Sequence, residues 1–176
     1  MKKSIYRKVM ASLLLLMILV SCSMKSEDEA VTEAKEAAEN SFQSTETLEA
    51  NKELEHTSFY LPERFHIESE ETSNIILKDG EQTYIVFNNS LEPASSELGA
   101  DSYQNLESLL FDTFKDDDKF GYILIMPETD KKYEMAIGIG GAKITTYTTK
   151  HDMAKDAEDL MLMSRSLVER NADGTE

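Results

Sequence analysis

Two short runs of carboxylates are the side chains of this sequence best suited to binding a ligand. Carboxylate oxygens can bind Ca²⁺, or they can attract basic groups of a partner protein. Neither run has the D-x-D-x-D-G spacing of a calcium loop, so no metal site is expected. We predict solvated loop charge and, as a hypothesis, an acidic binding rim. The residues of this rim are Glu68, Glu70, Glu71, Asp116, Asp117 and Asp118.

Other candidate chemistry is sparse. His56, His66 and His151 are scattered, with no pair at the helical spacing of a metal motif. The glycines at 138, 140 and 141 join two predicted strands, and no helix follows them as it would in a phosphate loop. No cofactor is therefore expected. The alternative is an enzyme that acts on cell-wall or extracellular material. It would use a carboxylate pair, such as Glu68 and Glu134, as acid and base.

The first residues have the features of an export signal. Four basic residues precede an apolar run over positions 10–20, and small residues follow. The run is shorter than the roughly 17–25 residues that span a bilayer. Cys22 is the only cysteine, so an intramolecular disulfide is impossible. An incidental cysteine in a secreted protein would leave an unpaired thiol, whereas acylation would consume it.

The segment Leu19, Val20, Ser21 and Cys22 resembles the lipobox of bacterial lipoproteins. The resemblance implies that residues 1–21 are a signal peptide and that a lipid is attached to the thiol of Cys22. It also implies attachment to the extracytoplasmic face of the cell membrane of a Gram-positive bacterium. The membrane, through this lipid, is then the first expected partner.

The charge limits the other partners. The formal net charge is −16, and removal of residues 1–21 takes four basic and no acidic residues, leaving 14 minus 34, or −20. Nucleic-acid binding depends on Lys and Arg at phosphates, so no nucleic acid is expected. Electrostatic docking on anionic lipid is also disfavoured. The charge is compatible with cationic proteins, among them an extracytoplasmic or membrane protein, and with peptides or metal ions, but its favoured role is to keep an exposed protein soluble.

Residues 22–57 are rich in Glu, Ala, Ser and Thr, and large apolar side chains are few. Such a segment buries too little surface to offset its ordering entropy. We predict an acidic, flexible tether, with a transient helix near residues 30–39.

Residues 58–170 are predicted to fold as one α+β domain. Residues 171–176 are predicted to be a polar tail. The clearest element is a hairpin of residues 74–78 and 82–88, joined by Asp79-Gly80 in a type I′ turn. Amphipathic helices are predicted over 101–115 and 152–169. The expected fold is a mostly antiparallel sheet of about six strands with both helices on one face.

One predicted strand has small residues on its second face. Tyr133, Met135, Ile137 and Ile139 alternate with Ala136, Gly138 and Gly140. The small residues could be the floor of a ligand site, but close packing of another element is favoured. Met161 and Met163 could bind a soft metal, but a core role is favoured.

The order of elements, the opening Tyr60-Leu61-Pro62-x-x-Phe65 and the closing ITTYTTKHDMAKDAEDLMLMSRSL are similar to the PsbP-like fold. They also resemble small uncharacterised lipoproteins of Gram-positive bacteria. The resemblance implies an accessory binding role at most and transfers no catalytic residues. The expected function is therefore a lipid-anchored protein with a non-enzymatic binding role.

Overall fold

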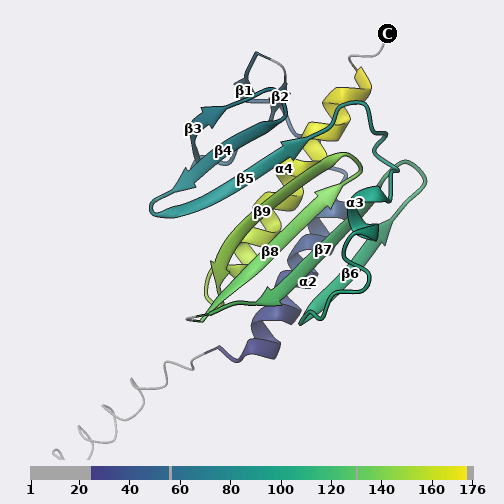
Figure 1. Ribbon diagram of the computed structural model, residues 1–176. Helices are drawn as coiled ribbons and strands as arrows, with labels where there is room; N and C mark the ends of the chain where they lie inside the picture. The colour runs from purple at the N-terminus through teal and green to yellow at the C-terminus, as the bar shows by residue number, and fades with distance from the viewer. Residues whose placement is uncertain (1–24, 56, 130, 174–176) are drawn as a thin grey trace, which may run out of the picture.

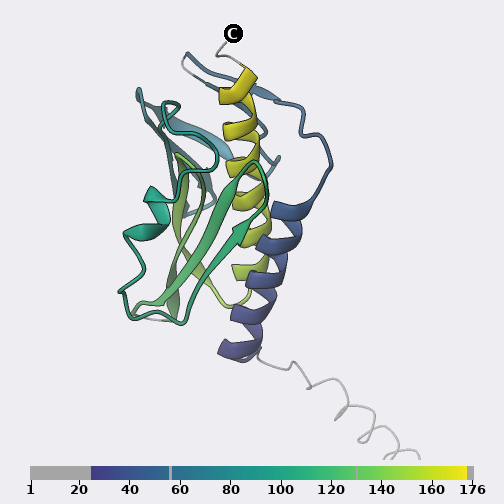
Figure 2. The same cartoon turned by 90° about the vertical axis from the view of Figure 1, so that its right-hand side faces the viewer.

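The computed structural model describes residues 25–55, 57–129 and 131–173. They form two layers: a seven-stranded antiparallel sheet and two long helices that cover one of its faces (Figures 1 and 2). The strands lie in the order β3-β4-β5-β9-β8-β7-β6, and β1 and β2 form a separate two-stranded sheet. The helices are α2 (Glu27–Gln43), α3 (Leu98–Asp101) and α4 (Met153–Asp173). The strands are β1 (Lys52–Glu53), β2 (Ser58–Phe59), β3 (His66–Glu70), β4 (Asn74–Asp79), β5 (Gln82–Asn88), β6 (Leu110–Lys115), β7 (Phe120–Pro127), β8 (Lys132–Ile139) and β9 (Ala142–Thr149). The predicted α+β class with a mostly antiparallel sheet and helices on one face is confirmed. The main sheet has seven strands instead of about six, and the helices on its face are α2 and α4 instead of the predicted pair over 101–115 and 152–169.

The predicted hairpin is the β4–β5 pair. Asp79 pairs with Gln82, so the two loop residues are Gly80 and Glu81, one position later than predicted. Gly80 has a φ of +56°, while Glu81 does not have a positive φ. Glycine at the first central position is the pattern of a type II′ turn and not of type I′. The hairpin is thus confirmed, and its turn type is corrected.

Helix α2 corrects the prediction that residues 22–57 form a flexible tether. Ala30, Ala34, Ala38 and Phe42 follow one another at four-residue spacing and are buried in the main core. The helix packs against α4, and the side-chain oxygen of Ser26 accepts a hydrogen bond from the amide of Glu29 at its start. Alanines add little to a hydrophobicity count, but their small size lets two helices approach closely. The folded region therefore begins well before Ser58.

Arg165 joins the end of α2 to α4. Its side chain is 1% exposed. It donates hydrogen bonds to the carbonyl oxygens of Ser41 at 3.0 Å, Ser44 at 2.7 Å and Glu46. Its Nε also lies 3.3 Å from Oε1 of Glu169. Helix α2 has no basic residue in its own last turn. The guanidinium therefore supplies both the donors and the positive charge that a helix C-terminus favours.

The predicted helix over 101–115 is wrong. The structure has only the short α3 there, followed by the edge strand β6. The apolar residues of β6 serve both faces of the sheet: Phe114 packs 5.7 Å from Phe42 of α2, and Phe111 packs against Tyr122 on the opposite face. The helix was predicted because Tyr103, Leu106, Leu110 and Phe114 recur at helical spacings of three and four. Pairing with β7 decided the conformation.

The helix predicted near the end of the chain is confirmed and is longer than predicted. The helix predicted over 152–169 is α4, which continues to Asp173. Residues 171–173 are thus helical backbone and not part of a polar tail. Met161 and Met163 of this helix are buried in the core, as favoured.

The small residues of β8 serve packing, as favoured. A Cβ placed on Gly138 would lie 2.7 Å from Cε1 of Tyr122, so the tyrosine ring covers this glycine. Tyr122 in turn packs against Ala100 and Tyr103 in the segment that includes α3. Gly121 on β7 similarly admits the ring of Phe42 from α2. No ligand floor is left at these positions.

The signal peptide, the lipobox and Cys22 lie outside the described residues. Among the residues that the structure describes, no helix is both long and apolar enough to cross a membrane.

The burial of α2 gives a direct test of the corrected boundary. We expect Phe42→Ala to lower the free energy of unfolding by about 3–4 kcal/mol, because it opens a cavity between α2 and the sheet. The exposed residue Glu36 of the same helix is a matched control, since Glu36→Ala should change stability by no more than about 0.5 kcal/mol. Urea unfolding followed by circular dichroism measures both variants. Equal stabilities of the two variants would mean that α2 is a tether after all.

Candidate functional site

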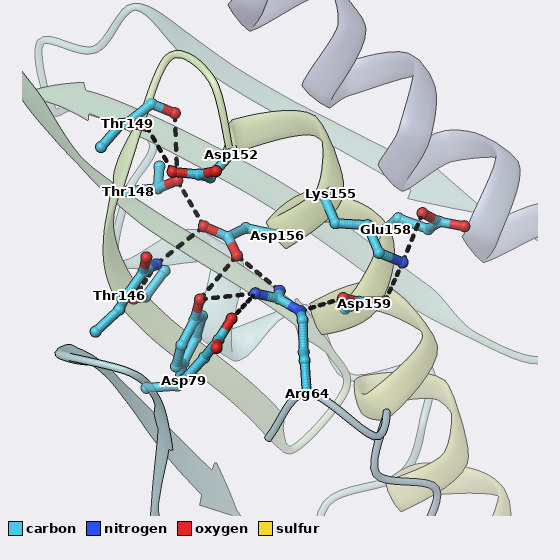
Figure 3. Close-up of polar contacts among 12 residues, drawn as sticks. Arg64, Asp79, Thr146, Thr148, Thr149, Asp152, Lys155, Asp156, Glu158 and Asp159 are labelled. Atoms are coloured by element: carbon cyan, nitrogen blue, oxygen red, sulfur yellow. Dashed lines mark hydrogen bonds and ion pairs between the residues drawn. The ribbon is translucent and has the colours of Figure 1, made fainter. Parts of the chain in front are cut away.

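A buried polar cluster joins α4 to the sheet and to the loop before β3 (Figure 3). Its centre is Asp156 of α4, whose side chain is fully buried. One carboxylate oxygen accepts hydrogen bonds from Nη2 of Arg64 at 2.7 Å and from the hydroxyl of Tyr84 at 2.9 Å. The other accepts from Nε2 of Gln82 at 2.9 Å and from Oγ1 of Thr148 at 2.5 Å. Four donors from three segments thus bind one carboxylate.

Arg64 connects three carboxylates. In addition to Asp156, its Nε donates to Asp159 at 2.6 Å and its Nη1 donates to Asp79 at 2.8 Å. Its guanidinium also lies 4.1 Å from the centre of the Phe65 ring, a cation–π contact. Burial alone would lower the pKa of Arg64, but the hydrogen bonds that it donates to Asp156, Asp79 and Asp159 outweigh burial and raise the pKa. The guanidinium is therefore a permanent charge.

Lys155 borders the cluster on α4. Its Nζ lies 2.8 Å from Oδ1 of Asp159 and 3.1 Å from Oε2 of Glu158. Burial would lower the pKa of Lys155, but the hydrogen bonds to these two carboxylates raise it overall. Both oxygens of Asp159 are thus bonded to a cation, one to Arg64 and one to Lys155.

This arrangement stabilises the fold and leaves little for a substrate. Burial, followed by the neighbouring charge of Asp156, raises the pKa of Tyr84, so its hydroxyl stays protonated and acts as a donor. Both oxygens of Asp156 are already bonded within the protein. Among the described residues, no group of three or more His, Cys, Asp or Glu residues is placed to hold a metal ion. We interpret the cluster as a joint between α4, β5, β9 and the loop before β3.

The sequence analysis missed this cluster, although a signal was present. Asp156 and Asp159 alternate with Met153, Ala157 and Leu160, the apolar residues of the buried face of α4. A carboxylate on a buried face needs a cation or several donors. Arg64, which lies within the predicted opening segment Tyr60-Leu61-Pro62-x-x-Phe65, was a candidate. The pairing itself could not be read from the sequence, because Arg64 and Asp156 are 92 positions apart.

The six acidic residues predicted as a rim form two separate clusters. Glu68 and Glu70 lie on β3 and Glu71 follows it, whereas Asp116–Asp118 lie in the β6–β7 turn. Strands β3 and β6 are the opposite edges of the sheet (Figure 1). Six strand spacings of about 4.8 Å put these edges roughly 29 Å apart. The two clusters therefore do not form one continuous rim.

The members of the two clusters also differ in their contacts. Asp116 accepts hydrogen bonds from the amides of Asp118 at 3.0 Å and Lys119 at 2.8 Å, and it pairs with the Lys119 side chain. Burial would raise the pKa of Asp116, but these contacts lower it overall. Glu68 lies 3.8 Å from Nζ of Lys78. Glu70 accepts a hydrogen bond from the amide of Glu55 at 3.2 Å.

The proposed catalytic pair of Glu68 and Glu134 is wrong. Glu134 lies on β8, and three strands separate β8 from β3. Four spacings of about 4.8 Å make that separation roughly 19 Å. Catalytic carboxylate pairs of glycosidases lie about 5–10 Å apart, so these two residues cannot share a substrate bond. The histidines offer no replacement, since His66 and His151 are exposed on different elements and His56 is outside the described residues.

Two surface hollows lie beside the acidic clusters. One of about 350 Å³ is lined by Glu70 and Glu71, and the other, of about 700 Å³, is lined by Asp118 and Lys119. Both are also lined by Ser90 and Leu91 of the loop between β5 and α3, so this loop lies between them. At this end of the sheet, some of the predicted acidic residues line hollows in the surface.

The sequence matches no known protein family and no curated protein. The chemistry of these sites and the N-terminal motif therefore carry the functional argument.

Replacing a single carboxylate oxygen in the buried cluster is expected to have a large effect on the free energy of unfolding. We expect Asp156→Asn to lower the free energy of unfolding by about 3 kcal/mol, because Arg64 loses a buried anionic partner. The matched control is Glu158→Gln on the exposed side of the same helix, with an expected change below about 1 kcal/mol. Urea unfolding of both variants checks this. A wild-type midpoint for Asp156→Asn would show that the cluster is not a structural joint.

Two buried tyrosines differ in hydrogen bonding, so the same substitution is expected to change the free energy of unfolding differently at each. The hydroxyl of Tyr84 bonds to Asp156 and Arg64, whereas that of Tyr122 has no hydrogen-bond partner among the described residues. Tyr84→Phe should therefore lower the free energy of unfolding by about 1–2 kcal/mol, whereas Tyr122→Phe should leave it unchanged or raise it. Denaturant unfolding at neutral pH compares them directly. A larger loss for Tyr122→Phe would contradict the hydrogen bonding described here.

Proposed function

We propose that this chain is a lipid-anchored protein on the extracytoplasmic face of the cell membrane, with a non-enzymatic binding or accessory role. The observation that carries the proposal is the segment Leu19, Val20, Ser21 and Cys22, placed after a basic and an apolar stretch. Acylation of Cys22 gives the single thiol of the chain a function. The lipid would hold the folded region at the membrane.

The state of the ionisable groups supports a non-enzymatic role. A catalytic acid or base must reach a proton of the substrate within hydrogen-bond distance. Both carboxylate oxygens of Asp156 and of Asp159 instead accept hydrogen bonds from Arg64, Lys155 and neighbouring donors. The exposed carboxylates named from the sequence lie on separate strands and turns. A binding role asks only for a stable surface, which this fold supplies.

The position of α2 supports close attachment to the bilayer. Ser26, at the start of α2, is four residues after Cys22. At about 3.6 Å per residue, these four residues span at most roughly 14 Å. The proposal thus replaces a long tether with a short link. Confinement near the membrane raises the effective concentration of the domain toward membrane-bound partners.

The charge supports a cationic protein as the partner. After removal of residues 1–21 the formal charge is 14 minus 34, or −20, which speaks against nucleic acid. Opposite charges across an interface speed association and select partners.

Anchoring is tested at Cys22. We expect wild-type protein to take up a radioactive fatty acid in living cells and to fractionate with membranes. Cys22→Ala should remain unlabelled and keep residues 1–21, because it lacks the thiol that accepts the lipid. Ser23→Ala is the matched control and should be labelled like the wild type. Equal labelling of Cys22→Ala and wild type, or an unlabelled wild type, would refute the proposal.

A further inference from the structure

The start of α2 and the acidic clusters lie at opposite ends of the sheet. The hydroxyl of Tyr133, near the start of β8, donates to Oε2 of Glu27 at 2.8 Å, so α2 begins at that end. The larger hollow joins the β5–α3 loop and the β6–β7 turn to Val168 and Glu169, near the end of α4. Both views show α2 beginning at the lower end and α4 ending at the upper end (Figures 1 and 2). If the proposed anchor holds, the end with the hollows points away from the bilayer.

The loop between the hollows displays an apolar side chain. Leu91 is 91% exposed. Hydrogen bonds hold the residues on either side of it in the loop. The amide of Asn89 donates to the carbonyl of Gly141 at 3.0 Å. Glu92 accepts hydrogen bonds from Asn89 at 2.9 Å and Ser96 at 2.8 Å. A single exposed leucine is ordinary. Here the hydrogen bonds of Asn89 and Glu92 hold the loop in a shape that places the exposed Leu91 between the two hollows.

Both hollows are acidic. Glu70 and Glu71 line the smaller hollow, and Glu92, Asp118 and Glu169 line the larger one. Glu71 and Asp118 take part in no ion pair among the described residues. The one lysine of the larger hollow, Lys119, is paired with Asp116, and its Nζ lies 4.6 Å from the centre of the Phe42 ring. The uncompensated charge beside Leu91 is therefore negative on both sides.

We propose that this end of the molecule binds an extended, basic segment of a partner protein. An apolar side chain of the segment would pack on Leu91, and basic side chains on either side would enter the two hollows. We call Leu91 and the two hollows the Leu91 surface. The β3 edge and the β6–β7 turn are on the order of 25 Å apart, which an extended chain spans in about eight residues. This inference rests on the proposed binding function and names the kind of partner that would be bound.

The probe is the fluorescent octapeptide KKSLLSKK, measured by anisotropy against the full-length protein in nanodiscs of uncharged lipid. Uncharged lipid keeps the peptide from binding the bilayer electrostatically. We expect binding at low salt that weakens as salt rises. Leu91→Ser should weaken binding about tenfold, in line with the loss of one apolar contact. The double variant Glu71→Gln, Asp118→Asn should weaken it about fivefold and flatten its salt dependence.

Matched controls separate a site from general attraction to an acidic protein. Leu98→Ser removes another exposed leucine, one that is 67% exposed on α3. The double variant Glu81→Gln, Glu128→Gln makes the same change of charge at the other end of the sheet. Both controls should bind the peptide like the wild type. Losses equal to those at the Leu91 surface, or no binding by the wild type at low salt, would overturn the inference.

The two proposals can fail separately. The peptide experiment needs the folded protein but not the lipid, because Cys22→Ala protein in detergent should bind equally well. Peptide binding by a protein that is never acylated would refute the anchor alone. Acylated protein that ignores the peptide would refute the Leu91 surface alone.

Discussion

The ion pair between Asp156 and Arg64 is the interaction on which the arrangement of α4 depends. A carboxylate without solvent is tolerable only when donors surround it, and Asp156 has four. These donors come from the loop before β3, from β5 and from β9. They fix the first turns of α4 across the centre of the sheet. The apolar residues of α4 supply most of the burial, while the ion pair selects one position of the helix.

The fixed position of α4 also determines that of α2. Arg165 extends from α4 to the carbonyl groups at the end of α2, and the alanine face of α2 packs against the core. The N-terminal segment is thereby part of the folded layer. This matters for the proposed lipid anchor, because Ser26 at the start of α2 is only four residues after Cys22. A short link favours one end of the domain toward the bilayer, whereas a long tether would favour none.

The distribution of charge separates stability from recognition. Inside, acids and bases are paired with one another and hold elements together. Outside, carboxylates such as Glu71 and Asp118 are exposed at the end of the sheet opposite to the start of α2. Exposed charges of this kind contribute little to stability. Exposed charges can steer and select a partner of opposite charge, and this is the role that the proposed binding function assigns to them.

The sequence by itself determined the elements whose patterns are local. The β4–β5 hairpin follows from alternation around Gly80, α4 follows from its apolar periodicity, and the α+β class follows from both. Tertiary structure decided the rest. The alanines of α2 predicted only a transient helix, and the pattern leading into β6 predicted a helix where a strand forms, because the stable conformations depend on packing against α4 and on pairing with β7. The partner of Asp156, and the separation of Glu70 from Asp118 across the sheet, depend on strand order. Strand order arises from contacts between distant residues, which no local pattern encodes.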